Sequence, residues 1–234
     1  MPSAVVLGAR NLGGAIAAHL HGEGWSVRAV ARSDESLQGV RARGIEGVNA
    51  DAGDPAALRA VLERDGGADL VVNAVSAARP TGGPWGGGPL ADAGPEAFEA
   101  WTGAVARQAF TFLSVGASVL RAQGRGGTLV QVTGGSARRG MPGRGLWAAG
   151  AAATRALVQA AAQELRAEGI HVALLIVDAT IASPKTAERT RDVPREALAD
   201  QEEIARAVAY LAGQAATGYT HELVVTPAGE RWVP

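Results

Sequence analysis

Short apolar segments alternate along this chain with segments of helical periodicity, and no other feature of the sequence restricts the fold as much. The segments SAVVLG, SVRAVAR, ADLVVNAV, GTLVQVTG and HVALLIVD are almost wholly apolar, and helix-forming, alanine-rich stretches lie between most of them. Strands without polar alternation are buried on both faces, as in a parallel sheet that helices cover on each side. We therefore predict a doubly wound α/β fold of about seven parallel strands, formed as a single domain by residues 1–234.

Two long irregular segments interrupt this alternation. Residues 76–95 are rich in glycine and proline, and residues 179–200 follow the apolar run HVALLIVD without clear periodicity. Loops of this length in compact domains are usually functional or mobile. Ligands of doubly wound sheets bind beyond the carboxyl ends of the strands. We therefore expect residues 76–95 to form a flexible loop beside the pocket and residues 179–200 to form a substrate lid.

Composition narrows the class of protein. The 22 basic residues are matched by 23 acidic ones, without a basic cluster, which argues against nucleic acid as a partner. The chain has no cysteine, its four histidines are scattered, and we expect no metal site. We predict that no apolar run is long enough to span a bilayer and that the amino terminus is not a signal peptide. These features predict a cytoplasmic protein that does not bind membranes.

The first predicted strand runs into a glycine-rich turn, VVLGARNLGGAIA. Gly8 and Gly14 are six residues apart, as in turns where backbone N–H groups hold a pyrophosphate at a helix amino terminus. Arg10, Asn11 and Leu12 lie between them. The middle position that needs a small residue holds Asn11 or Leu12, so Gly13 would have to compensate through a shifted turn. A tight connection without a ligand is the alternative interpretation.

Polar residues follow the next three predicted strands. Arg32 ends the second strand, where an arginine accommodates a 2′-phosphate and an acidic residue would instead bind the ribose. A bound dinucleotide would therefore be NADP(H) in preference to NAD(H), unless Arg32 is an ordinary solvated side chain. Asp51 follows the third strand, and Asn73 with Ala74 follows the fourth. Each of these could also be a simple turn residue.

Taken together, these motifs resemble the short-chain dehydrogenase/reductase family over essentially the whole chain. The glycine turn, Asp51, the Asn73–Ala74 pair, PLADAGPEAF and GMPG occur in the order and at the spacing of that family. The resemblance implies a Rossmann-type fold, a nicotinamide cofactor and an adenine-side role for Asp51. The sequence is similar to a divergent branch in which Asp178 and Ala179 replace the usual Pro-Gly pair after the sixth strand.

The residues that carry the family's chemistry are missing. The resemblance implies hydride transfer in which a tyrosine donates or accepts the proton, with lysine, serine and asparagine in support. Aligning GMPG places these four roles on Trp147, Ala151, Gly134 and Val105. The chain has only two tyrosines, Tyr210 and Tyr219, and Lys185 is its sole lysine. A phenol is a poor base near neutral pH without a neighbouring cation. The resemblance also implies that the lysine holds the nicotinamide ribose, so without it we expect a dinucleotide to be bound weakly or not at all.

Several residues could replace the missing groups. Asp178, at the carboxyl end of the sixth strand, could act as an acid or base if burial raised its pKa, and Thr133 could orient a carbonyl. Capping and strand-end hydrogen bonds are the structural alternatives for these two. We expect Trp85, Trp147, Ala179 and Thr180 to line the substrate pocket. His171 should have a structural role at the surface.

Three functions are compatible with this pattern. The first is an enzyme of secondary-metabolite type that performs a non-redox step such as cyclisation, dehydration or isomerisation. The second is an NADPH-dependent reductase in which water or Asp178 supplies the proton. The third is a non-catalytic partner or ligand-binding protein. In each case we expect a homodimer or homotetramer that packs through the helices at 98–123 and 146–168, with a small molecule as ligand.

Overall fold

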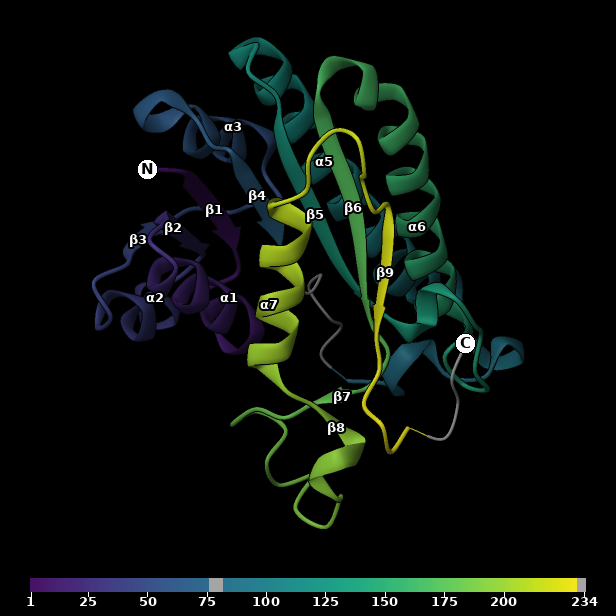
Figure 1. Cartoon of the computed structure of the whole chain (residues 1–234). Coiled ribbons are helices and arrows are strands. Elements are labelled where there is room, and N and C mark those ends of the chain that lie inside the picture. Colours follow the sequence, from purple (N-terminus) through teal and green to yellow (C-terminus); the bar gives the residue numbers. More distant parts are fainter. Residues whose placement is uncertain (76–81, 231–234) are drawn as a thin grey trace.

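The computed structural model describes residues 1–75 and 82–230, and its centre is one parallel sheet of seven strands (Figure 1). The strand order is β3-β2-β1-β4-β5-β6-β9, and every neighbouring pair is parallel. The strands are β1 (Ser3–Leu7), β2 (Ser26–Ala31), β3 (Glu46–Asn49), β4 (Leu70–Asn73), β5 (Gly127–Gly134), β6 (Ile170–Val177) and β9 (Glu222–Val225). This architecture confirms the predicted doubly wound, Rossmann-type fold.

Helices cover both faces of the sheet because alternate residues of each buried strand point to opposite sides. On one face pack α3 (Pro55–Glu63), α5 (Ala104–Gln123) and α6 (Gly145–Leu165); on the other pack α1 (Asn11–Gly22), α2 (Asp34–Arg41) and α7 (Gln201–Ala212). In β1, Val5 and Leu7 belong to the first core, whereas Ala4 and Val6 belong to the second. The apolar runs of the sequence are thus explained by two separate cores.

The helix predicted over residues 98–123 is longer and less regular than expected. It continues from α4 (Pro95–Phe98) through a five-residue π-helical segment, Glu99–Gly103, into α5. Residues Pro95–Gln123 are long and apolar enough to cross a membrane by length and composition, so the prediction that no such run exists was wrong. Phe112, Leu113 and Leu120 of this helix are buried in the core over the sheet. This packing against the sheet explains why the helix is apolar.

The segment 179–200 is not wholly irregular. Its ends pair as two short parallel strands, β7 (Thr180–Ile181) and β8 (Leu198–Ala199), which form a separate two-stranded sheet. Figure 1 shows this small sheet beyond the carboxyl end of β6, before α7 returns along the main sheet. The proposed lid therefore has both ends fixed. Of the other predicted loop, residues 76–81 lie outside the described part of the chain.

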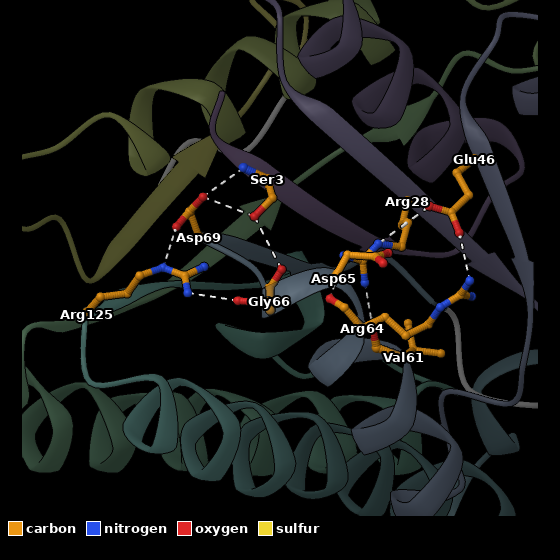
Figure 2. Close-up of polar contacts among 10 residues, drawn as sticks. Ser3, Arg28, Glu46, Val61, Arg64, Asp65, Gly66, Asp69 and Arg125 are labelled. Atoms are coloured by element: carbon orange, nitrogen blue, oxygen red, sulfur yellow. Dashed lines mark hydrogen bonds and ion pairs between the residues drawn. The ribbon is translucent and has the colours of Figure 1, made fainter.

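Charged residues tie together the amino-terminal ends of the strands (Figure 2). Asp69 accepts hydrogen bonds from the backbone N–H of Ser3 at 2.8 Å and from Arg125 Nε at 3.1 Å. Burial favours a higher pKa for Asp69, but these hydrogen bonds outweigh it and hold the pKa below the ordinary value of 3.8. The buried Arg28 donates to the carbonyl oxygens of Val61 and Arg64 at 2.8 and 2.9 Å. This edge of the sheet is closed by structural contacts.

His171 is buried, and the prediction of a surface position was wrong. It lies in β6, its side chain is stacked on Tyr219 with ring centroids 4.3 Å apart, and Nε2 is 2.9 Å from the carbonyl oxygen of Thr220. Burial lowers the pKa of His171 below 6.5, and the neighbouring His221 lowers it further. The sequence could not show this burial because His171 opens its strand beside the final loop, whose position only the fold decides.

We expect the stability of the protein to decrease as the pH falls below about 6.5. In that range the unfolded chain binds a proton at His171 that the folded chain excludes, so the free energy of unfolding decreases by at most about 1.4 kcal/mol per pH unit from this group. His171→Phe keeps the stacking ring and removes the titration. Urea unfolding between about pH 7.5 and 5.5 should show a shallower pH dependence for this variant. The exposed His21→Gln should leave the dependence unchanged; an equal change in both variants would contradict the assignment.

Candidate functional site

The carboxyl ends of the central strands open into a cavity of about 1130 Å³. Its wall combines the start of α1, the ends of β4, β5 and β6, the turn after β5, one side of α5 and α6, and the segment that follows β7. The cavity therefore lies where ligands of doubly wound sheets bind. The predicted site residues that line it are Arg10, Asn11, Leu12, Asn73, Ala74, Trp85, Val105, Thr133, Gly134, Trp147, Ala151, Asp178, Ala179 and Thr180.

The glycine turn packs more tightly at Gly13 than at Gly14. A Cβ atom on Gly13 would lie 2.1 Å from the carbonyl oxygen of Gly8, and one on Gly14 would lie 2.7 Å from that of Ala9. Gly8 has a φ of +102°, and Asn11 takes the left-handed conformation with a φ of 48°. The shifted turn that the sequence left open is therefore the one observed, because Asn11 supplies the reversal and Gly13 the close approach.

This turn leaves the amino terminus of α1 open to a ligand. Arg10 is the N-cap residue, and its side chain makes no capping hydrogen bond. The first N–H groups of a helix lack partners within the helix and carry its positive dipole end, which favours an anion such as a pyrophosphate. Arg10, Asn11 and Leu12 all line the cavity. A turn in which Gly13 leaves no space for a Cβ atom and Gly8 takes a positive φ fits the close approach of a dinucleotide phosphate.

Four of the predicted cofactor residues do not line the cavity. Gly8 and Gly14 are within the turn, and Arg32 and Asp51 lie outside the lining at the ends of β2 and β3. Arg32 is exposed, and neither it nor Arg10 forms an ion pair within residues 1–75 and 82–230. Asp51 accepts a hydrogen bond from the N–H of Gly53 at 2.8 Å, so it stabilises its own turn.

Asn73 connects the two central strands. Its Nδ2 donates to Gln131 Oε1 at 2.8 Å, and Gln131 Nε2 donates to the carbonyl oxygen of Val132 at 2.8 Å. Asn73 Oδ1 also accepts from the N–H of Val75 at 3.3 Å. Asn73 is 2% exposed, so its polar atoms are paired within the protein and fix the floor of the cavity. The sequence did not indicate that Gln131 is the hydrogen-bond partner of Asn73.

No phenol lies among the described residues that line the cavity. Tyr210, on α7, is 57% exposed, and Tyr219 is stacked on His171 beside the opposite edge of the sheet. Lys185 lines the cavity from the segment after β7, and Ala151 is buried in α6. Trp147 also lines the cavity, and its place at the family's tyrosine position stays a prediction from the alignment of GMPG.

Three tryptophans from separate segments form one aromatic cluster. Trp85 and Trp147 have ring centroids 5.7 Å apart, and Trp101 lies 5.9 Å from Trp85 and 5.8 Å from Trp147. The guanidinium of Arg144 lies 4.6 Å above the ring of Trp85. Edge-to-face and tilted pairs at such distances are attractive. The sequence predicts Trp85 and Trp147 at the pocket but does not indicate Trp101, because its π-helical segment follows no regular period.

Glycines allow the loop around Trp85 to lie on the start of α6. A Cβ atom on Gly86 would lie 2.9 Å from Arg144 Cγ, and one on Gly87 would lie 2.7 Å from Leu146 Cδ1. Both glycines have positive φ angles, 84° and 98°. Larger residues could neither adopt this backbone nor fit the space. The described part of the predicted flexible loop is thus packed on α6 and fixes Trp85 at the cavity.

Asp178 lies in the cavity wall as predicted, but it faces a cation. Arg139 donates to both of its carboxylate oxygens, from Nη1 to Oδ2 and from Nη2 to Oδ1, the latter at 3.0 Å. The side chain of Asp178 is 6% exposed and that of Arg139 is 25% exposed. A carboxylate held in this bidentate manner accepts a hydrogen bond on each oxygen from the same guanidinium. Sequence spacing could not indicate this pair, since the two residues lie 39 positions apart.

Gly135 makes room for this ion pair. A Cβ atom at Gly135 would lie 1.9 Å from Asp178 Oδ1, so only glycine permits the carboxylate to lie over the end of β5. Gly134 is paired with Val177, the residue before Asp178. The ion pair therefore lies directly beside Gly134, the position that the alignment of GMPG assigns to the family's serine.

We predict that Gly13→Ala abolishes dinucleotide binding. The added methyl group overlaps the carbonyl oxygen of Gly8, so the turn must open, at a cost of about 1–3 kcal/mol in folding free energy. Gly22→Ala, at the exposed end of the same helix, has no atom within 4 Å of the new methyl group and should leave binding unchanged. Fluorescence titration with NADPH and thermal unfolding measure both effects. Equal binding by the two variants would show that the turn does not hold the ligand.

We also predict that Asp178→Asn destabilises the protein by about 2 kcal/mol, because it leaves the partly buried Arg139 without its carboxylate. The exposed ion pair of Arg206 and Glu203 provides a control. Glu203→Gln should cost less than about 1 kcal/mol. Urea unfolding near neutral pH compares the two, and similar costs would show that the Asp178 pair contributes nothing special to stability.

Comparison with known proteins agrees with this description. The family described as enoyl-(acyl carrier protein) reductase matches residues 6–229 of the chain. A metagenomic short-chain oxidoreductase in complex with NADP is 26% identical, with a TM-score of 0.74 over 98% of each chain. A short-chain dehydrogenase/reductase family protein is 25% identical, with a TM-score of 0.79 over 96% of this chain and 95% of that one.

A structure of lower identity shares the fold. This structure is of a protein from Agrobacterium tumefaciens with bound NADP, and its name gives 2-deoxy-D-gluconate 3-dehydrogenase as a provisional activity. It is 24% identical, with a TM-score of 0.76 over 96% of this chain and 94% of that one. No curated protein sequence is significantly similar to this chain.

Proposed function

Since the chain belongs to the short-chain dehydrogenase/reductase family, we propose that it binds NADP(H) and transfers hydride to or from a small organic molecule, with solvent as the source of the proton. The observation that carries this proposal is the continuity of the cavity. One space of about 1130 Å³ joins the amino terminus of α1 to the carboxyl ends of β4, β5 and β6. Pockets for drug-sized ligands occupy roughly 300–1000 Å³, so this cavity has room for a large ligand such as a dinucleotide.

In this proposal, different residues of the chain bind different parts of NADP(H). The N–H groups of Asn11 and Leu12 would hold the pyrophosphate, and Arg10 and Arg32 would contact the 2′-phosphate. NADP in the related metagenomic oxidoreductase supports this assignment. The nicotinamide, when bound, supplies or accepts the hydride. Trp147 and Trp85 would form the wall beside it, limit the access of water and orient the substrate.

The proton cannot come from the family's relay in this proposal. The four positions hold Val105, Gly134, Trp147 and Ala151, of which only the indole of Trp147 has a polar hydrogen, and it does not ionise near neutral pH. Asp178 is engaged by Arg139 on both carboxylate oxygens. Water that enters the cavity is therefore the proposed proton donor, and we expect slow turnover compared with relatives that keep the relay.

A non-redox reaction is the second candidate, and the simultaneous replacement of all four relay residues favours it. In such a reaction the cavity would act by positioning a substrate for cyclisation, dehydration or isomerisation. NADPH carrying deuterium at the transferred position distinguishes the two candidates for any substrate that is turned over. Deuterium in the product supports hydride transfer; product formed without loss of NADPH supports the non-redox reaction. Binding without any turnover would support a non-catalytic role.

We expect Arg32→Ala to lower the affinity for NADPH about tenfold, because a charge-assisted hydrogen bond to phosphate contributes about 1.5–3 kcal/mol. The affinity for NADH should stay the same, since NADH has no 2′-phosphate. Arg43→Ala, another exposed arginine outside the cavity lining, serves as the control. NADPH fluorescence titrations measure each affinity. Equal losses for NADPH and NADH would refute the proposed role of Arg32.

We also propose that the protein is a cytoplasmic homodimer or homotetramer that packs through α5 and α6. Phe98, just before the π-helical segment, is 50% exposed, and Phe110 of α5 is 58% exposed. Exposed aromatic side chains on a helix support burial against a second copy of the chain.

A further inference from the structure

The wall of the cavity carries an excess of positive charge that the whole chain does not have. Its basic residues are Arg10, Arg139, Arg144, Lys185 and Arg189, and its acidic residues are Asp178 and Glu230. The chain as a whole has 22 basic and 23 acidic residues. A cavity lined by one sign of charge attracts ligands of the opposite sign. The excess is therefore a local property of the site.

Apart from Arg10 at the start of α1, three of these cations have no acidic partner among the described residues. Asp178 is paired with Arg139, which donates to both of its carboxylate oxygens. Arg144, Lys185 and Arg189 form no ion pair within residues 1–75 and 82–230, and the contact of Arg144 with the Trp85 ring leaves its charge uncompensated. Arg144 is held in place by Gly86, which lies against its side chain. The site thus has a fixed guanidinium at the aromatic cluster and two further cations on the segment between β7 and β8.

The phosphates of the proposed cofactor do not account for these cations. The pyrophosphate site lies at α1, which follows β1, whereas Lys185 and Arg189 follow β6 and β7. β1 and β6 are separated by β4 and β5 in the sheet. Neighbouring strands are about 4.8 Å apart, so the two ends of the site are about 14 Å apart at the level of the strands. The second group of cations is therefore placed for the substrate.

The aromatic cluster indicates the shape of the rest of the ligand. Trp85 and Trp147 both line the cavity, with ring centroids 5.7 Å apart, and Trp85 is 42% exposed. Flat aromatic surfaces favour planar apolar groups, which stack on them or meet them edge to face. The guanidinium of Arg144 lies beside this surface and can bind a carboxylate or phosphate in a bidentate manner.

We propose that the substrate of this site is an organic anion with a planar apolar body. The body would lie against Trp85 and Trp147, and a carboxylate or phosphate would bind Arg144, Lys185 and Arg189. This inference rests on the proposed function only in placing the dinucleotide at the other end of the cavity. It requires no particular reaction at the substrate.

Isothermal titration calorimetry with three probes tests the proposal. The probes are cinnamate, phenyl phosphate and the neutral cinnamamide, each added to the protein saturated with NADP⁺ at low ionic strength. We expect at least one anion to bind about tenfold more tightly than cinnamamide, and the tighter of the two anions identifies carboxylate or phosphate as the group recognised. The double variant Lys185→Gln/Arg189→Gln should reduce this preference to about threefold or less.

Controls separate this proposal from the proposed function. Arg206→Gln, on α7 outside the cavity, should keep the full preference for the anion. Equal or tighter binding of cinnamamide, or a preference that survives the double variant unchanged, would overturn the proposal. If NADP⁺ does not bind, the proposed function fails, and the same titrations on the free protein still decide the preference for anions.

Discussion

Burial of one parallel sheet on both faces is the constraint on which the rest of this structure depends. Seven strands run in the same direction, so all of their carboxyl ends meet at one edge. The opposite edge is closed by the contacts of Asp69 with Ser3 and Arg125 and by the buried Arg28, as Figure 2 shows. Helices occupy both faces, and therefore the carboxyl edge is where the fold has space for a ligand.

Small residues control how closely the segments around that space approach. Gly13 allows α1 to approach the end of β1, Gly135 allows the Asp178 carboxylate to lie over β5, and Gly86 allows the tryptophan loop to lie on Arg144. Each glycine brings a group with chemical capability to the cavity: helix N–H donors, an ion pair, and an aromatic ring with its cation. The site is built by backbone contacts that a single methyl group would prevent.

The described wall of the cavity offers groups that position and bind a ligand. Trp147 and Trp85 offer flat apolar surfaces, and Arg139 holds Asp178 in a charged pair. Such a site can still orient two ligands, since positioning requires no ionising group. In the proposed reaction the proton comes from water, so the slow turnover that we expect follows from the residues at positions 105, 134, 147 and 151.

The fold could be predicted from the sequence, because apolar runs such as HVALLIVD alternate with helical segments, and strands without polar alternation are typical of a sheet covered on both faces. Motif spacing predicts that Trp147 and Ala151 occupy the family's tyrosine and lysine positions, and this assignment stays a prediction. Tertiary structure alone decided the partner of Asp178, the burial of His171 and the meeting of Trp101 with Trp85. These depend on contacts between residues far apart in sequence, and periodicity and spacing report only on local conformation. The turn at Gly13 lies between the two cases: the sequence offered a shifted turn, and the left-handed conformation of Asn11 selected it.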